Sequence, residues 1–308
     1  MKFKNCRDLM IMVQRYVNIK LQFILSLLIL IFIAIDYYDL EFVTLRILIP
    51  ITVASIIDIV LRFIKLRQLT FPWGAIISGM MIGLLSIRTQ SLYTLFLAAS
   101  IAIISKHTIV RWRKNIFNPA AFSLLIVSFL FPKEFYVNHS SYLEHSSSLY
   151  FAYSYLRLDR WEVLIWSSHC AIGFVSSIAI IILGLLITYR VKRLNLTFGF
   201  LTTYILLFTI FALYIGQEIL VRLSLEVFGA GGGLFFFTFF MLTDPPTSPA
   251  RNQTLYGLIV ASIAFILRFL TNPIQFLLIT LIVMNMLIRL IDTKVTRLNN
   301  LLKNLIRI

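Results

Sequence analysis

Residues 21–35 read LQFILSLLILIFIAI, and this stretch decides the fold class. The run contains no charged side chain, and comparable apolar runs recur along the whole 308-residue chain. Hydrophobic residues make up 59% of the sequence and charged residues 13%, with a mean hydropathy of +0.90. Soluble domains contain roughly 45–50% and about 25% of these classes. Because a helix needs about 20 mostly apolar residues to cross a bilayer, we predict an all-α integral membrane protein.

Ten apolar segments are predicted to form transmembrane helices, five on each side of a connection of mixed polarity at 132–162. A basic leader, 1–20, precedes them and a basic tail, 293–308, follows. The leader and first run are similar to a signal peptide, but acidic and aromatic residues follow instead of a small-residue cleavage site, so we expect a retained helix. The halves are 21–131 and 163–292. The predicted helices are 21–35, 43–63, 73–88, 92–110 and 117–131, then 163–189, 198–216, 219–242, 255–271 and 274–292.

The formal net charge of +15 is spread in short basic bunches between the apolar segments. These bunches recur after every second predicted helix, whereas most acidic residues fall in the alternate connections. By the positive-inside rule, this pattern predicts that both termini are cytoplasmic. A nucleic-acid binder instead gathers its basic residues on one soluble face, so we expect the lipid bilayer as a partner and no nucleic acid.

A short internal repeat relates the two halves. Residues 91–102 contain SLY and then ASIA, and residues 254–264 contain TLY and then ASIA. In each half an Asn-Pro pair opens the next predicted helix, at 118–119 and at 272–273. Five predicted helices separate the copies, so the copies must face opposite sides of the membrane. We therefore predict two inverted five-helix repeats, an arrangement of transporter folds that carries its site near the midplane.

Two kinds of helix end are candidates for a site. Asn118 and Asn272 each precede a proline, which fits a helix cap with proline at the first position; alternatively, these helix starts aim their positive ends at a ligand. The stretch 243–249 reads TDPPTSP and ends the eighth predicted helix. Asp244 either caps the next turn and pairs with Arg251, or it lies in irregular backbone that lines a wet cavity.

Glycines form a second class of candidates. Residues 228–233 read FGAGGG and open the eighth predicted helix. No Gly-Lys-Ser/Thr follows, so the stretch is not a phosphate-binding loop. Glycines here, and Gly79 with Gly83 on the third predicted helix, allow either close helix packing or room for a flat ligand.

Asp58 is the one acid inside a predicted span, and intramembrane acids are candidates for function. Arg62 follows it by four residues, the helical spacing that favours an ion pair, so an ion-binding role and a structural role both stay open. His169 and Cys170 lie in the sixth predicted helix without further ligands nearby in sequence, so we expect no metal site. No nucleophile–base pair or nucleotide motif occurs, which leaves open whether the chain is an enzyme.

Four stretches together resemble a known family: 78–83 (SGMMIG), 106–107 (KH), 118–121 (NPAA) and 239–245 (FFMLTDP). Their order resembles the RnfD membrane protein of the Rnf electron-transport complex and its NqrB counterpart in the sodium-translocating NADH:quinone reductase, over about residues 43–292. The resemblance implies a ten-helix fold similar to urea channels, in a prokaryotic cytoplasmic (inner) membrane. It also implies other membrane or redox subunits as partners, and flavin-linked electron transfer coupled to sodium or proton movement.

The sequence departs from this family at two places. Family members carry an FMN on the Thr of a Ser-Gly-Ala-Thr motif between the fifth and sixth helices, but residues 144–150 read EHSSSLY here. We therefore expect no covalent FMN, and a noncovalent flavin (riboflavin or FMN) as the cofactor. In the sixth helix the family tends to show Gly-Glu-Thr-Ser, whereas residues 173–176 read GFVS, which lacks the acid.

Three functions are compatible with these features. The first is a membrane subunit of a flavin-linked electron-transport and ion-translocating complex that binds flavin or quinone noncovalently. The second is a transporter or channel for a small solute or cation. The third is a ligand-free assembly subunit that holds partners through its glycine-rich helices. Asp58 and Asp244 are the candidates for an ion pathway, and the cofactor-binding candidates are Gly79, Asn118, Gly231, Gly232, Gly233, Thr243 and Asp244.

Overall fold

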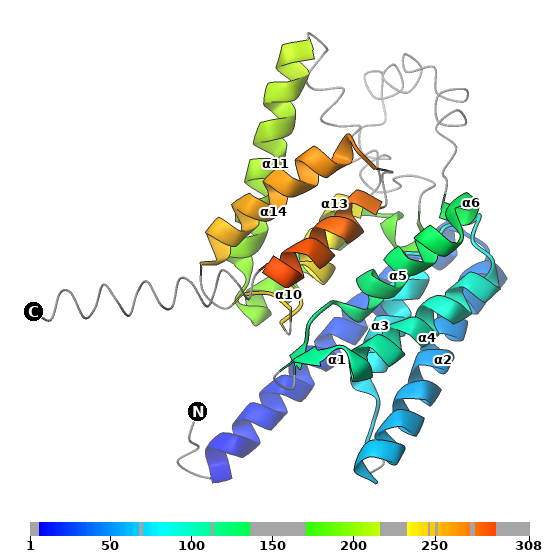
Figure 1. The fold of residues 1–308 in the computed structure, drawn as a ribbon. Coiled ribbons are helices and arrows are strands. Elements are labelled where there is room, and N and C mark those ends of the chain that lie inside the picture. Colours follow the sequence, from blue (N-terminus) through cyan, green and yellow to red (C-terminus); the bar gives the residue numbers. More distant parts are fainter. Residues whose placement is uncertain are drawn as a thin grey trace, which may run out of the picture.

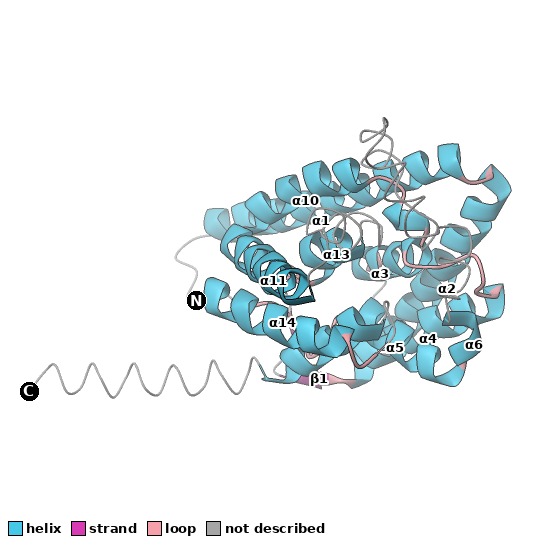
Figure 2. Cartoon of the chain, turned by 90° about the horizontal axis from the view of Figure 1, so that it is seen from above, coloured by secondary structure: helices cyan, strands magenta, loops and turns pink. Residues whose placement is uncertain are grey.

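The computed structural model describes residues 6–67, 70–111, 114–135, 171–215, 233–245, 247–249, 252–271 and 275–287. Within these residues the regular secondary structure is helical, apart from two antiparallel strands of two residues each, β1 (Val110–Arg111) and β2 (Lys114–Asn115). The predicted all-α class is confirmed in this coarse form (Figure 1). The helices form two groups at opposite ends of the molecule, with α1, α3 and α13 between them (Figure 2).

The helices of the first half begin and end close to the predicted segments. The exception is the first helix, which begins at Cys6 and so continues through most of the basic leader. The third helix ends at Leu84, before the predicted end at residue 88. The elements are α1 (Cys6–Tyr37), α2 (Leu40–Leu66), α3 (Trp73–Leu84), α4 (Leu92–Thr108), α5 (Pro119–Leu130) and the short α6 (Pro132–Phe135).

The second half contains both long and short elements. The sixth predicted helix, 163–189, is described only from residue 171, where a single 3₁₀ turn precedes a helix that begins at Ser177. The eighth predicted helix is described only from Gly233 and ends in a π-helical turn. The elements are η1 (Ile172–Phe174), α10 (Ser177–Val191), α11 (Leu194–Ile215), α13 (Gly233–Phe236), the π-helix η3 (Phe237–Met241), α14 (Gln253–Arg268) and the helix Gln275–Leu287.

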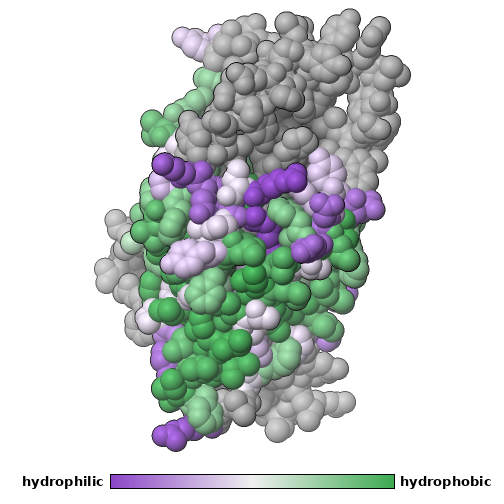
Figure 3. Space-filling view, turned by 90° about the vertical axis from the view of Figure 1, so that its right-hand side faces the viewer, coloured by the Kyte–Doolittle hydropathy of each residue, from purple (hydrophilic) through white to green (hydrophobic). Residues whose placement is uncertain are grey.

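Three of the described helices are long and apolar enough to cross a membrane: Asn18–Tyr37, Leu40–Lys65 and Leu194–Tyr214. The other apolar helices have 10–17 residues, shorter than a full span. On the surface, a broad apolar belt lies between two polar zones, as expected for a protein embedded in a bilayer (Figure 3). The number of ten spans stays a prediction.

Small residues bring helix backbones together within each half. A Cβ atom at Gly79 of α3 would lie 2.7 Å from the Cα atom of Ile51 in α2, and one at Gly83 would lie 2.8 Å from the carbonyl oxygen of Arg46. In the second half, a Cβ atom at Gly257 of α14 would lie 2.7 Å from the carbonyl oxygen of Leu196 in α11. The predicted close approach at Gly79 and Gly83 is therefore confirmed.

One contact between the two halves lies where α3 ends and the segment before α10 begins. α3 has 12 residues and is about 18 Å long, less than the roughly 30 Å of a hydrocarbon core. The irregular segment 85–91 follows it and contacts the irregular segment 171–176 of the second half, where the Ile172 N–H donates to the Ser86 carbonyl at 3.0 Å. Irregular backbone at membrane depth is tolerated only where protein or a wet cavity surrounds it.

Candidate functional site

Asp58 is the most deeply buried charged side chain described. It lies two turns before the end of α2, and its side chain has no exposed surface. Isoleucines precede and follow it in the sequence, and α2 packs against α3 and α4. A carboxylate in such surroundings is costly unless cationic partners compensate the lost hydration.

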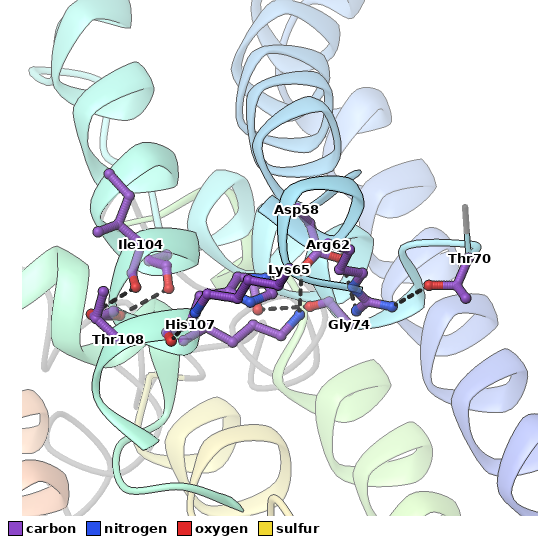
Figure 4. Close-up of polar contacts among 12 residues, drawn as sticks. Asp58, Arg62, Lys65, Thr70, Gly74, Ile104, His107 and Thr108 are labelled. Carbon is purple, nitrogen blue, oxygen red and sulfur yellow. Dashed lines mark hydrogen bonds and ion pairs between the residues drawn. The ribbon is translucent and has the colours of Figure 1, made fainter. Parts of the chain in front are cut away.

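Three basic side chains, Arg62, Lys106 and His107, meet the Asp58 carboxylate (Figure 4). Arg62, one turn further along α2, approaches Oδ2 at 2.8 Å. From the end of α4, His107 Nε2 lies 2.8 Å from Oδ1 and Lys106 Nζ lies 3.3 Å from the same atom. The predicted Asp58–Arg62 pair is thus confirmed, and two further partners come from another helix. We call these four residues the Asp58 cluster.

A second layer of contacts holds the Asp58 cluster in place. Lys65 Nζ donates to the His107 carbonyl at 2.8 Å, which ties the ends of α2 and α4 together. Arg62 Nη1 donates to the Thr70 hydroxyl at 2.9 Å. At Gly74, a Cβ atom would lie 3.0 Å from Lys106 Nζ, so the glycine leaves room for this ammonium group. The cluster therefore fixes the ends of α2 and α4 and the start of α3 relative to one another.

The charge balance of the Asp58 cluster limits what it can bind. One carboxylate faces a guanidinium and an ammonium group, with a third positive charge whenever His107 is protonated. The cluster is thus positive overall, and both carboxylate oxygens lie within ion-pair distance of these partners, although Oδ2 accepts no hydrogen bond. Such a site repels a free metal cation and is better suited to hold helices together or to act on a neighbouring negative charge.

Asp244 is an acid on which the charge of this cluster acts. It lies outside the helices, in the turn that follows η3, and Lys106 is the cation that acts on it electrostatically. The residue keeps some exposed surface, but burial of the carboxyl is the dominant influence and raises its pKa to about 7, opposed by a hydrogen bond with Thr247 and by the charge of Lys106. Among the described residues no cation lies within ion-pair distance of Asp244; Arg251, its predicted partner, lies outside them.

The sequence as a whole matches a known protein family. A sequence model of the family described as NQR2, RnfD, RnfE matches residues 12–300. The chain belongs to the NQR2, RnfD, RnfE family. The family resemblance expected from four short stretches is therefore confirmed over nearly the whole chain.

A curated protein of named function is similar to part of this family member. The D component of the Na(+)-translocating ferredoxin:NAD(+) oxidoreductase complex of Acetobacterium woodii is 33% identical over 99 residues. These residues are 32% of the present chain and 28% of that relative. The match thus spans less than a third of the relative's length.

The other predicted binding residues of this NQR2, RnfD, RnfE member have structural contacts of their own. Asn118 is buried at the start of α5, where its side-chain oxygen accepts the N–H groups of Ala120 and Ala121, so the predicted cap is confirmed. Thr243 is buried and donates its hydroxyl to the Phe239 carbonyl. Gly231 and Gly232, like the second Asn-Pro pair at 272–273, lie outside the described residues.

Three of the described candidates are engaged in packing or capping. At Gly79 the space beside the glycine is filled by the α2 backbone, and at Gly233 a Cβ atom would lie 2.9 Å from the ring of Phe174. The Asn118 carboxamide oxygen is already used by two backbone N–H groups. Thr243 and Asp244 lie in one irregular turn. No group of three or more His, Cys, Asp or Glu side chains that could hold a metal occurs within the described ranges; His169 and Cys170 fall outside them.

Sequence reasoning assigned no role to Lys106 and His107, although both belong to a stretch that carries the family resemblance. They are 48 and 49 residues from Asp58. A usable signal was present: the positive-inside pattern places the ends of the second and fourth helices on the same side of the membrane, where a buried acid requires cationic partners.

Proposed function

We propose that this chain is a membrane subunit of an electron-transport complex that moves ions across a prokaryotic cytoplasmic membrane, with Asp244 as the group that exchanges the ion. Family membership and the function named for the Acetobacterium woodii relative support the complex. The observation that carries the ion step is a buried carboxyl in irregular backbone, outside any ion pair with a described residue and next to the Asp58 cluster.

Asp244 is favoured over Asp58 because only Asp58 has ion-pair partners among the described residues. Asp58 already has two cationic partners and His107 within 3.3 Å, so a cation would have to displace them. Asp244 has a pKa of about 7, so it can bind and release a cation or proton near neutral pH. In this proposal the positive Asp58 cluster limits how tightly Asp244 holds a cation, which favours release.

We further propose that the two halves are inverted repeats. α2 packs on α4 in the first half and α11 packs on α14 in the second, which are equivalent positions if the halves share one fold. The third helix of each half is short where it is described, α3 and α13 with η3, and irregular backbone follows it. Asp58 and Lys106 belong to one half and Asp244 to the other, so the proposed ion step takes place where the halves meet.

A noncovalent flavin is the cofactor that the family resemblance suggests. Because Gly79, Gly233 and Asn118 are engaged in packing and capping, we propose that a flavin site of this chain centres on Thr243 and Asp244, with Gly231 and Gly232 as the remaining candidates. No covalent attachment is proposed, because the connection lacks the Ser-Gly-Ala-Thr motif.

The transporter hypothesis has less support than the electron-transport proposal. It relied on Asp58, which the Asp58 cluster neutralises, and on two broken helix starts, of which only Asn118 is described. The assembly hypothesis predicts the same partners as the electron-transport proposal but no ion step. A test must therefore separate a subunit that exchanges an ion from one that only holds its partners.

The substitution Asp244→Asn makes this separation. In inverted membrane vesicles supplied with a low-potential electron donor, we expect ion uptake, followed as ²²Na⁺ uptake and as internal acidification, to fall to the level of membranes that lack the chain. The amide is nearly isosteric but cannot bind or release a charge. Asp39→Asn, at the exposed start of α2, serves as the matched control and should leave uptake unchanged.

The amount of assembled complex must be measured in the same membranes. Loss of uptake with a normal amount of complex supports the proposal. Normal uptake in the Asp244→Asn membranes would contradict the assignment of Asp244, and normal uptake in membranes without the chain would contradict the proposed function itself.

A further inference from the structure

A second buried charge lies at the opposite end of α2. Arg46 is twelve residues before Asp58, about 18 Å along the helix axis, and only 7% of its surface is exposed. Its guanidinium donates to three backbone carbonyl oxygens: Nη1 to Ile87 at 2.9 Å, and Nη2 to Arg88 at 3.1 Å and to Gln90. Three carbonyls from four consecutive residues therefore converge on one cation.

These carbonyls can accept the guanidinium because α3 stops early, and the Ile87 carbonyl also accepts the Gln90 N–H at 3.1 Å. After Leu84 the chain runs irregularly to Ser91, so the carbonyls of this segment lack the helical N–H groups that would otherwise bond them. The Arg46 guanidinium takes the position in which a dissolved cation would otherwise satisfy the carbonyl oxygens.

The surroundings of the segment support this interpretation. Above the guanidinium, the Phe42 ring lies 4.5 Å from the Arg46 Cζ atom and favours a cation there. The outer side of the segment is bound to Glu134, whose carboxylate accepts the backbone N–H of Ser91 at 2.9 Å and the Thr94 hydroxyl at 2.8 Å. The chain between α3 and α4 thus turns its carbonyls toward a cation and its donors toward a carboxylate.

We propose that the carbonyl cluster of Ile87, Arg88 and Gln90 is a site for a monovalent cation, and that Arg46 keeps it filled with a tethered guanidinium. Rings of backbone carbonyls replace the hydration shell of monovalent cations in channel filters. Here the covalently attached cation cannot leave, so free cations are excluded where segment 85–91 meets the second half at Ile172.

The proposal is independent of the proposed electron transport, because it concerns only the chemistry of the carbonyl cluster. Its test uses the purified full chain and the variants Arg46→Ala and Arg46→Lys. Thermal unfolding is compared in sodium chloride, potassium chloride and choline chloride of equal ionic strength, and in choline chloride with added millimolar guanidinium.

We expect Arg46→Ala to melt below the wild type in choline chloride. Sodium, potassium or guanidinium should then raise its melting temperature by about 2–4 °C, because a ligand that binds only the folded state stabilises it. The wild type and Arg46→Lys, whose sites stay filled, should show no such cation-specific rise. If Arg46→Ala does not fold, Arg46→Gln, which also lacks the charge, replaces it with the same expectation.

A purely structural role of Arg46 predicts a different result. In that case the neutral variant is destabilised equally in all three salts, and guanidinium does not restore it. Equal melting temperatures of a folded neutral variant in sodium, potassium, choline and guanidinium would overturn the proposal.

Discussion

Asp58→Asn is expected to be the most damaging single substitution in the described part of the chain. It leaves the guanidinium of Arg62 and the ammonium group of Lys106 at a buried site without their counter-charge. Removing one partner of a buried ion pair costs about 3–5 kcal/mol of folding free energy. We expect a strong fall in the yield of folded protein and in the melting temperature of what remains, measured by thermal unfolding in detergent.

Two variants separate this effect from a general sensitivity to substitution. Asp39→Asn changes an exposed acid of the same helix, whose side chain makes no cap hydrogen bond, and should be close to neutral. The double variant Asp58→Asn with Lys106→Met removes one of the surplus cations and should recover part of the lost stability. A melting temperature of Asp58→Asn equal to that of the wild type would contradict the role given to the Asp58 cluster.

Gly79→Ala has the second largest expected effect. The added methyl group would lie 2.7 Å from the Ile51 Cα atom and 2.8 Å from the Pro50 carbonyl oxygen, both backbone atoms of α2 that cannot move aside alone. Forcing extra volume into a packed interface costs about 1–3 kcal/mol. We expect a lower melting temperature, because α3 must move away from α2.

Gly74→Ala on the same helix is the matched control. There the methyl group meets Lys106 Nζ, the far end of a flexible side chain, so the loss of stability should be smaller. A stable Gly79→Ala protein that loses bound flavin would point instead to the ligand-binding role predicted from the sequence.

Much of the fold follows from local sequence features. Apolar runs between basic bunches located the helices, the four-residue spacing identified the Asp58–Arg62 pair, and the Asn-Pro order identified the cap at Asn118. Each of these features depends on residues within one or two helical turns. Such short-range information is present in a single sequence.

The features that the sequence did not reveal depend on contacts between distant segments. Lys106 and His107 reach Asp58 across nearly fifty residues. Charge patterning places Arg46 on the outer side of the membrane and says nothing more of it. Nothing in its own helix indicates that carbonyls at 87–90 accept its guanidinium. Those carbonyls are available to the guanidinium because α3 ends at Leu84. The apolar sequence continues past that point without a helix-stop signal.

The same dependence on distant segments explains why the sequence left two roles open for the glycines, close packing and ligand binding. A glycine that leaves room for a ligand and one that leaves room for a backbone have the same sequence signature. At Gly79 the space is filled by α2, and at Gly74 by the end of Lys106, as the positions of the neighbouring atoms show. Only the packing of other elements decides between the two uses.

Membership of an electron-transport complex is tested most directly by purifying the tagged chain in mild detergent from its native membranes. The purified material is analysed for associated proteins and by visible absorbance before and after denaturation and filtration. We predict that redox subunits co-purify in fixed proportion, and that flavin absorbance is released into the filtrate rather than retained on this chain. A chain that purifies alone, without redox-active partners or a flavin spectrum, would contradict the account.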